Sequence, residues 1–452
     1  QQFWLKPILH KVATQLIYFR KEQMGVGSNT DLESETLHLV GNDLQSGSES
    51  DDEPLALWRN PVCICGCCCG LVSLFVVAYI GLSYYVAHVF VALHPKVHLI
   101  SDESGKMYTP MNMSQNPLCQ VRKHEMGGCA SQQLLEAFSN YSAKYPFKLV
   151  RFLSRVGTSN QQIVNLSAWW LPAQQPNAPR VVIGHGYRRN YDAFYVQVAG
   201  YMLRSMGFSV LALSYRDHGA SDDSAIPYNT WGYDYPYDLL GAWDYAAQDP
   251  QGELGGSMPS EKVGLMGFSM GGFVAASAFG IEPRVPALWL DSPAFDVKGN
   301  VVQGIKAKLP LPGLGTLLAP AILFFCQKIT GVDLSLNSPE KCLKSSDAQK
   351  TRPVALIANP NDVTVPFSQA EMYLSLFNET PQYELKQEDL SKYACGTETH
   401  VNALTWQPQS YRRKLCDFWS AAFDKDPLLC GIDFLPSFPE CPAMSCPGPG
   451  PR

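Results

Sequence analysis

Apolar positions along this chain form one long run near its beginning and many short runs after residue 145. The long run covers residues 71–93, and no Asp, Glu, Lys or Arg lies between Arg59 and Lys96. A helix needs about 20 apolar residues to cross a bilayer core. A buried core helix is seldom this long and this free of charge, and a signal peptide has a shorter apolar stretch nearer its start. We therefore predict one transmembrane helix within residues 61–95.

The short runs alternate with amphipathic stretches from about residue 145 onward. Buried strands are expected at residues 181–183, 208–213, 263–266, 287–290 and 354–358, and a further short strand is expected near Tyr383. Helices are expected at residues 191–206, 235–248, 270–279, 368–376 and 408–423. Alternation of this kind predicts an α/β fold with a mostly parallel central sheet flanked by helices.

The two ends of the chain have compositions that do not predict a packed core. Residues 29–53 are rich in Ser, Gly, Asn and acid, and the last residues are rich in Pro. Such segments cannot bury enough apolar surface to fold alone. The expected divisions are a disordered acidic tail (1–60), the membrane helix (61–95), a connecting region (96–144), two core parts (145–295 and 351–425) around an insert (296–350), and a Pro-rich tail (426–452).

Glycosylation sequons and cysteines suggest an orientation for the membrane helix. All four sequons follow the helix, at Asn112, Asn140, Asn165 and Asn378. This distribution favours a lumenal or extracellular catalytic domain and a cytosolic residue 1–60 tail, as in a single-pass type II membrane protein. The nine later cysteines could then form disulfides, for example Cys119 with Cys129. A cluster at the cytosolic edge is a candidate for S-acylation, or is inert: Cys63, Cys65, Cys67, Cys68 and Cys69.

Composition excludes some partners and adds no cofactor. The chain is 46% apolar and 17% charged, and its net charge of -6 offers no basic surface for nucleic acid. We expect no nucleic-acid partner, and no motif in the sequence indicates a cofactor or a metal.

The strongest chemical signal is Gly267-Phe-Ser269-Met-Gly271-Gly272, between an expected strand and an expected helix. A sharp strand-to-helix turn of this pattern lifts a serine above the edge of a sheet, with glycines where side chains would collide. Ser269 is therefore the candidate nucleophile. A serine at its ordinary pKa needs a base, and that base needs an acid to orient it.

Chain order selects the base and the acid. In this kind of site the order is serine, acid, histidine, and His400 is the only histidine after Ser269. The best-placed acid is Asp362, which follows the strand expected at 354–358. Asp291, after the preceding strand, is the reserve candidate.

The reaction also requires two donors for an oxyanion. We expect the backbone N–H of Met270 and the backbone N–H of Tyr187, in the loop Gly184-His-Gly-Tyr187-Arg-Arg. His185 is interpreted as a structural histidine that braces this loop. Arg188 and Arg189 are expected to face solvent, although they could reach an anionic substrate group.

Several motifs together resemble the α/β-hydrolase superfamily. They are His185-Gly-Tyr-Arg-Arg-Asn, Tyr215-Arg-Asp-His-Gly-Ala-Ser, the Ser269 turn, Asp291-Ser-Pro and Asn361-Asp-Val-Thr-Val-Pro. Over residues 145–425 the chain is similar to the serine-aminopeptidase-like hydrolases, which include Bem-type membrane hydrolases and dipeptidyl-aminopeptidase-related esterases. The resemblance implies Ser269, Asp362 and His400 as nucleophile, acid and base. The chain departs from the family pattern at two places: at Asn359-Pro-Asn361, where Gly-x-x-Asp is usual, and at Thr399, where Gly is frequent.

The resemblance also implies a role for the insert at 296–350, whose centre at 309–329 is apolar. In this fold such an insert forms a helical cap over the active site. An apolar cap near a membrane favours an ester substrate with an acyl or lipid-like group, although these residues could also simply pack the cap onto the core. A serine aminopeptidase or dipeptidyl peptidase is the alternative enzyme, and a non-catalytic binding protein is the alternative outside catalysis.

Overall fold

The computed structural model describes residues 61–93, 140–142, 144–157, 162–387, 400–401, 403–406 and 408–425. The chain divides into two compact units, residues 1–71 and 72–452. Of the first unit, only residues 61–71 are described, and they form the first turns of one helix. The sheet and all other described helices belong to the second unit. The predictions for the tails at 1–60 and 426–452, for most of the connecting region and for a Cys119–Cys129 disulfide lie outside the described residues.

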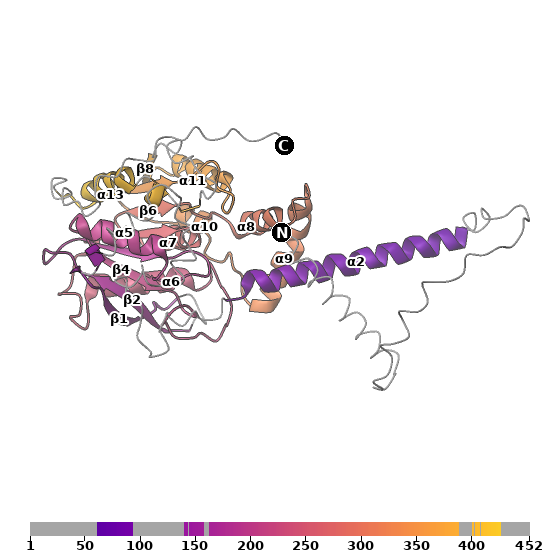
Figure 1. Ribbon diagram of the computed structural model, residues 1–452, viewed down its shortest axis with the longest axis horizontal. Coiled ribbons are helices and arrows are strands. Elements are labelled where there is room, and N and C mark those ends of the chain that lie inside the picture. The colour runs from indigo at the N-terminus through magenta and orange to yellow at the C-terminus, as the bar shows by residue number, and fades with distance from the viewer. Residues whose placement is uncertain are drawn as a thin grey trace, which may run out of the picture. The chain divides into compact units, whose positions relative to one another are not determined.

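Eight strands form one sheet in the order β1-β2-β4-β3-β5-β6-β7-β8 (Figure 1). β1 and β2 are antiparallel to their neighbours, whereas β4, β3, β5, β6, β7 and β8 run parallel. This confirms the predicted mostly parallel sheet. The strands are β1 (Lys148–Leu153), β2 (Asn165–Leu171), β3 (Arg180–Gly184), β4 (Ser209–Ser214), β5 (Val263–Phe268), β6 (Leu288–Asp291), β7 (Arg352–Ile357) and β8 (Tyr383–Gln387).

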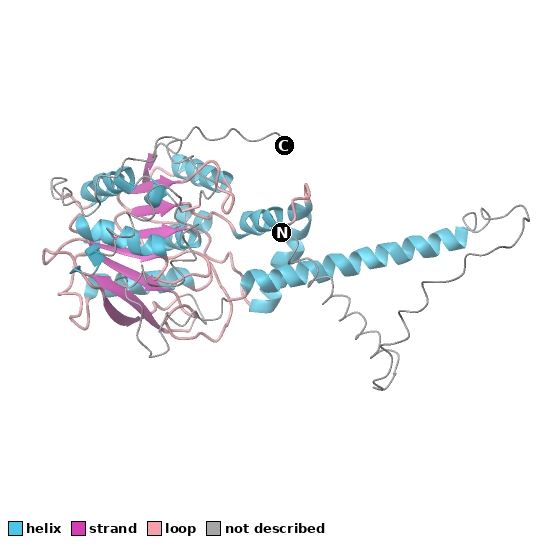
Figure 2. Ribbon diagram, viewed as in Figure 1, coloured by secondary structure: helices cyan, strands magenta, loops and turns pink. Residues whose placement is uncertain are grey.

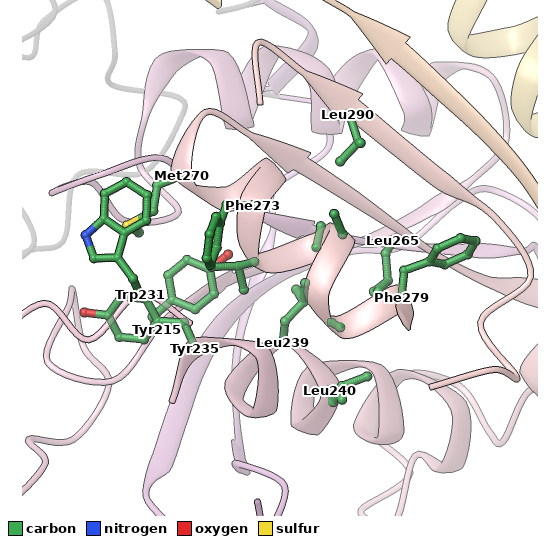
Figure 3. Packing of buried hydrophobic residues seen from close by; sticks show 14 of the residues in the cluster. Tyr215, Trp231, Tyr235, Leu239, Leu240, Leu265, Met270, Phe273, Phe279 and Leu290 are labelled. Carbon is green, nitrogen blue, oxygen red and sulfur yellow. The ribbon is translucent and has the colours of Figure 1, made fainter. Parts of the chain in front are cut away.

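Helices cover both faces of the sheet (Figure 2). One face carries α5 (Phe194–Ser205), α12 (Ala403–Trp406) and α13 (Pro408–Ala422). The other carries α6 (Tyr235–Gln248), α7 (Met270–Ile281), α10 (Pro339–Lys344) and α11 (Phe367–Glu379), and the short η4 (Ser260–Lys262) directly precedes β5. Alternate residues of the central strands enter the two cores: in β5, Leu265 packs toward α6 and α7 (Figure 3), and Met266 packs on the opposite side. Covering on both faces explains why these strands are apolar throughout.

Two strands were not among those expected from the sequence. β1 and β2 pair antiparallel at one edge, with Val150 opposite Ala168. In β1 the side chains of Val150 and Phe152 are buried, while Arg151 and Leu153 are exposed. An alternating strand lacks the continuous apolar run that identified the central strands.

The insert between β6 and β7 is helical, as the resemblance implied. It contains α8 (Val297–Lys308), α9 (Leu314–Thr330) and α10. The side chain of Gln303 in α8 donates to the carbonyl oxygen of Val363 at 2.7 Å, so α8 borders the loop that follows β7. Several large apolar residues of this insert remain exposed, including Leu311 (62%), Leu317 (54%) and Phe324 (53%).

One long helix, α2 (Pro61–Val91), precedes the sheet. Its part Val72–Val91 is, in the described residues, the one segment long and apolar enough to cross a membrane, by length and composition. This part contacts α9, which lies beside it in Figure 1. The Tyr79 hydroxyl donates to the carbonyl oxygen of Leu317 at 3.1 Å, and the rings of Tyr84 and Phe325 meet edge to face at 5.6 Å.

Candidate active site

Ser269 lies in the predicted sharp turn between β5 and α7. Its backbone has φ 54 and ψ -120, a strained conformation for a residue with a side chain. Two hydrogen bonds hold the turn: the Ser269 N–H donates to the Asp291 carbonyl at 2.9 Å, and the Ser269 carbonyl accepts from the Ala294 N–H at 3.1 Å. A Cβ on Gly271 would lie 2.4 Å from the Gly184 carbonyl oxygen, so only glycine permits α7 to approach β3 this closely.

Asp362 and His400 form a direct pair. The distance from His400 Nδ1 to Asp362 Oδ2 is 2.7 Å, and the Asp362 side chain is almost fully buried. The other carboxylate oxygen of Asp362 accepts from the N–H groups of Thr364 and Val365 at 2.8 and 2.9 Å. Both oxygens therefore have partners, and the carboxylate fixes the orientation of the imidazole.

The departure at Asn359-Pro-Asn361 leaves this acid loop well ordered by hydrogen bonds. The Asn359 side-chain oxygen accepts from the Asn361 N–H at 2.9 Å, and the Asn359 carbonyl accepts from the Asp362 N–H at 3.0 Å. An asparagine side chain thus closes the turn, a role for which this residue type is well suited.

The reserve candidate, Asp291, has different partners. It is fully buried, and its carboxylate accepts from the Tyr411 hydroxyl at 2.7 Å and from the Ser292 hydroxyl at 3.0 Å. Burial raises the pKa of Asp291 to about 6, and the hydrogen bonds and the nearby His400 oppose that rise. The structure therefore places Asp362, rather than Asp291, on the imidazole of His400.

The turn at Asp291 and Ser292 connects the nucleophile to the base. The Ser269 N–H binds the Asp291 carbonyl, and the Val401 N–H donates to Ser292 Oγ at 3.2 Å. Ser269 and His400 thus flank the same turn at the carboxyl ends of the parallel strands. No hydrogen bond between the Ser269 hydroxyl and His400 is formed among the described residues. Such bonds are often long before substrate is bound.

The loop after β3 lies against the nucleophile. A Cβ on Gly186 would lie 3.2 Å from the Ser269 Cβ, and the Gly186 N–H donates to the Tyr195 hydroxyl at 2.9 Å. Within the described part of the chain, the N–H groups of Tyr187 and Met270 donate to no protein group. Met270 is the first residue of α7, where helix geometry leaves N–H groups without intrahelical partners. The two expected oxyanion donors are therefore both available.

His185 braces this loop, in agreement with the interpretation from the sequence. It is fully buried, and burial holds the pKa of His185 well below its ordinary value, so the ring is neutral. Its Nδ1 donates to the Gly186 carbonyl at 2.9 Å, and its Nε2 accepts from the Tyr215 N–H at 3.3 Å.

The expectation that Arg188 faces solvent was wrong. Its guanidinium donates to the carbonyl of Ala92 at 2.9 Å and to that of Val89, both at the end of α2. The neighbouring Tyr187 hydroxyl donates to the carbonyl of Phe90, and burial raises the pKa of Tyr187 to about 12. Local sequence holds no signal for these contacts, because the partners lie about 96 residues earlier in the chain.

Sequence reasoning also missed the residues that support the pair. Ser292 and Tyr411 were not singled out, although the Asp291-Ser-Pro string was noted as a motif. Tyr411 lies in α13, and its hydroxyl also accepts from the indole N–H of Trp289 at 3.2 Å. Only the packing of α13 against β6 brings the tyrosine to the carboxylate.

One family model matches the central part of the chain. Residues 175–353 match the family model described as serine aminopeptidase, S33. That segment includes Tyr187, Ser269 and Met270, whereas Asp362 and His400 lie beyond its end. No curated protein sequence is similar enough to the chain to count as a match.

Three solved structures illustrate the structural similarity. An esterase from Pyrococcus furiosus is 21% identical, with a TM-score of 0.45 over 62% of this chain and 92% of that chain. The α/β-hydrolase GrgF from Penicillium sp. sh18 is 18% identical, with a TM-score of 0.45 over 62% and 99%. An acylaminoacyl peptidase from Pyrococcus horikoshii is 16% identical, with a TM-score of 0.43 over 62% and 42%.

Proposed function

We propose that this chain, a serine hydrolase of the serine-aminopeptidase-like α/β-hydrolases, cleaves carboxylic esters of apolar acyl groups at Ser269 while α2 anchors it in a membrane. The observation that carries the proposal is the His400–Asp362 pair, at 2.7 Å, beside the turn that holds Ser269. A nucleophile, a base and an orienting acid in this order perform acyl transfer on many folds.

In the proposed acylation step, His400 Nε2 accepts the proton of the Ser269 hydroxyl as Oγ attacks the ester carbonyl carbon. The N–H groups of Tyr187 and Met270 donate to the oxyanion of the tetrahedral intermediate. The imidazolium is stabilised by Asp362, then gives its proton to the leaving alcohol oxygen as the C–O bond breaks. The product of this step is an acyl-Ser269 ester.

Deacylation reverses these roles. Water attacks the acyl carbon while His400 Nε2 accepts its proton, and the same two N–H groups bind the second oxyanion. The intermediate collapses when the Ser269 oxygen leaves and takes the proton back from His400. A carboxylic acid is released, and the free serine is restored.

An ester substrate is supported by the leaving group and by the cap. An amide nitrogen must be protonated as it leaves, and peptidases of this kind need groups that fix the peptide or its terminus. Among the residues that the structure describes no such group stands out, whereas α9 offers buried Leu318 and Ile322 and exposed Leu317 and Phe324. Each methylene of an acyl chain that becomes buried would contribute about 0.8 kcal/mol.

A serine aminopeptidase is the second candidate, because it is the activity named by the family model that matches residues 175–353. The same triad and oxyanion donors can cleave an amide. A third possibility, a binding protein without catalysis, predicts that no serine reacts with a fluorophosphonate.

The membrane part of the proposal rests on α2, and three features support a lumenal or extracellular hydrolase. Residues Val72–Val91 suffice for one crossing. Cys416 is disulfide-bonded, which is typical of an oxidising compartment. Two sequon asparagines that follow α2, Asn140 and Asn378, have exposed side chains.

A panel of substrates tests the proposal on the purified full-length protein. It contains p-nitrophenyl esters from acetyl to dodecanoyl, together with aminoacyl and dipeptidyl amides. We expect kcat/KM to rise with acyl length to a plateau, and Ser269→Ala to abolish turnover. Ser277→Ala is the matched control, since Ser277 lies in α7, the helix that follows Ser269, and its hydroxyl donates to the Phe273 carbonyl. Equal turnover of all esters, or better cleavage of dipeptidyl amides, would contradict the ester assignment.

A further inference from the structure

Each backbone carbonyl at the carboxyl end of α2 accepts a hydrogen bond. The donor is either a residue of the hydrolase core or, for His88, the N–H of Ala92 one turn later. The last four carbonyls of a helix lack intrahelical partners. Here the Val89 and Ala92 carbonyls accept from Arg188, and the Phe90 carbonyl accepts from the Tyr187 hydroxyl. The Val91 carbonyl accepts from the Asn229 N–H at 2.7 Å. A hydrophobic anchor that merely tethered the enzyme would not need its end capped by the hydrolase.

Aromatic packing reinforces the same junction. The ring of Phe90 stacks on Tyr187, with centroids 5.9 Å apart, and on Trp231, with centroids 5.7 Å apart. Trp231 in turn meets Phe273 of α7 edge to face at 5.6 Å (Figure 3). Phe90 therefore links the oxyanion loop to the helix that begins at the nucleophile. Val91, the last residue of α2, is fully buried in the same core.

The loop held in this way includes strained backbone. Arg188 has φ 54, in the left-handed region that favours glycine. A conformation of this kind persists only where the surroundings determine it. The surroundings here are the carbonyl of Val89 in α2 and that of Ala92 directly after it, which the Arg188 guanidinium binds. The residue before Arg188 is Tyr187, whose N–H is the proposed oxyanion donor. Gly186, one residue earlier, lies against Ser269.

We infer that the end of α2 is part of the catalytic machinery: through Phe90, Tyr187 and Arg188 it positions the oxyanion loop, and these side chains are positioning residues. None of the three side chains contacts the reacting atoms. The inference rests on the proposed function, because the donor role of the Tyr187 N–H belongs to that proposal. It adds that the membrane helix controls the rate of the chemical step as well as the location of the enzyme.

Three substitutions in the full-length protein test the inference. Tyr187→Phe removes the hydroxyl that binds the Phe90 carbonyl and keeps the stacked ring. Arg188→Gly removes the guanidinium, and glycine tolerates φ 54 without added strain. Phe90→Ala removes the ring from the α2 side. Because a lost oxyanion donor costs about 10²–10³ in kcat, we expect a misplaced one to cost about tenfold, with KM changed less than about twofold.

Tyr187→Phe and Phe90→Ala each have a matched control. Tyr383→Phe also removes a buried tyrosine hydroxyl bound to a backbone carbonyl, that of Leu343, but at the amino end of β8. Phe75→Ala removes a phenylalanine from the same helix at a position that is 64% exposed. Phe90→Tyr keeps a stacking ring, so its loss of kcat should be smaller than that of Phe90→Ala. The two controls, Tyr383→Phe and Phe75→Ala, should retain the wild-type kcat.

The readouts separate positioning from stability. Rates are expressed per serine titrated with a fluorophosphonate, so loss of folded protein does not lower kcat. The Ki of an acyl trifluoromethyl ketone, whose adduct carries an oxyanion, should rise in parallel with the loss of kcat. Unchanged kcat and Ki in all three variants would overturn the inference while leaving the hydrolase assignment intact. A wild-type protein without Ser269-dependent hydrolysis would instead overturn the proposed function itself.

Discussion

At the scale of single residues, two buried carboxylates near His400 have different tasks. Asp362 binds the imidazole and two backbone N–H groups, whereas Asp291 binds two hydroxyls. Both follow parallel strands and so reach the same edge of the sheet. Sequence position could rank the two aspartates, but only the position of His400 in the folded chain determines which one the histidine meets.

Exchanging each carboxylate for an amide distinguishes their tasks. Asp362→Asn cannot hold the imidazole in its productive tautomer, so we expect kcat to fall by about 10³–10⁴-fold. Asp291→Asn keeps a similar shape but can accept only one of the two hydroxyl hydrogen bonds, because its amide nitrogen is a donor. Since neither bond involves the imidazole of His400, a loss of less than about tenfold is expected. Steady-state kinetics on a short ester provide the measurement. A larger loss for Asp291→Asn would make Asp291 the acid.

The raised pKa of Asp291 also predicts a pH dependence of stability. The pKa is about 6 in the folded chain against an ordinary value of 3.8, with burial as the main cause. The folded state therefore binds a proton more tightly than the unfolded state. This contribution is fully present below pH 3.8 and is lost as the pH rises through 6. The melting temperature of the wild type should therefore fall relative to that of Asp291→Asn as the pH rises from 3.8 through 6. If the melting temperatures of the two proteins depended on pH in the same way, the raised pKa of Asp291 would be contradicted.

At the scale of elements, the sequence predicted the strands and turns that a continuous stretch of neighbouring residues defines. Strands β3 to β7 have continuous apolar centres because helices cover both faces, so their runs were found within a few residues. β1 and β2 were missed because pairing with a distant strand defines them. The turn at Ser269 was recognisable because its glycines are dictated by local collisions. The contacts of Arg188 with α2 depend on a partner far away in sequence, and no local pattern indicates them.

One glycine of that turn offers a direct test of close packing between elements. A Cβ on Gly271 would lie 2.4 Å from the Gly184 carbonyl oxygen, which is backbone and cannot swing aside. Gly271→Ala should push α7 away from β3 and lower the free energy of unfolding by about 1–3 kcal/mol. Gly304→Ala is the control, since nothing lies within 4 Å of its added Cβ in the exposed middle of α8. We expect it to be neutral or stabilising by up to about 1 kcal/mol. Equal stability of the two variants would refute this packing argument.

At the scale of the whole molecule, the hydrolase is joined to its proposed anchor by hydrogen bonds and aromatic contacts. Tyr79 and Tyr84 bind the cap helix α9, and the end of α2 binds the oxyanion loop. From Tyr79 to Val91 the helix rises about 18 Å, so these contacts extend along more than three turns. Exposed apolar residues of the cap therefore lie beside a helix proposed to enter the bilayer, which suits a substrate with an acyl chain.

Glycosylation tests the proposed topology of the molecule. In a eukaryotic host we expect a glycan at Asn378, which is exposed in α11, so that glycosidase shifts the mobility of the wild type more than that of Asn378→Gln. Asn165 should carry none, because it pairs with Leu153 in the sheet and the Ser167 hydroxyl of its sequon is buried against Ser221. No shift in any variant, with protease access to the hydrolase from the cytosol, would reverse the orientation.

Covalent labelling tests the central claim most directly. The full-length protein is treated with a fluorophosphonate, digested, and mapped by mass spectrometry. We predict a single phosphonylated residue, Ser269, with labelling lost in Ser269→Ala and strongly reduced in His400→Ala. Ser277→Ala should label as the wild type does. Labelling at another serine, or a folded wild-type protein that does not label at all, would contradict the assignment of Ser269, Asp362 and His400 as the catalytic triad.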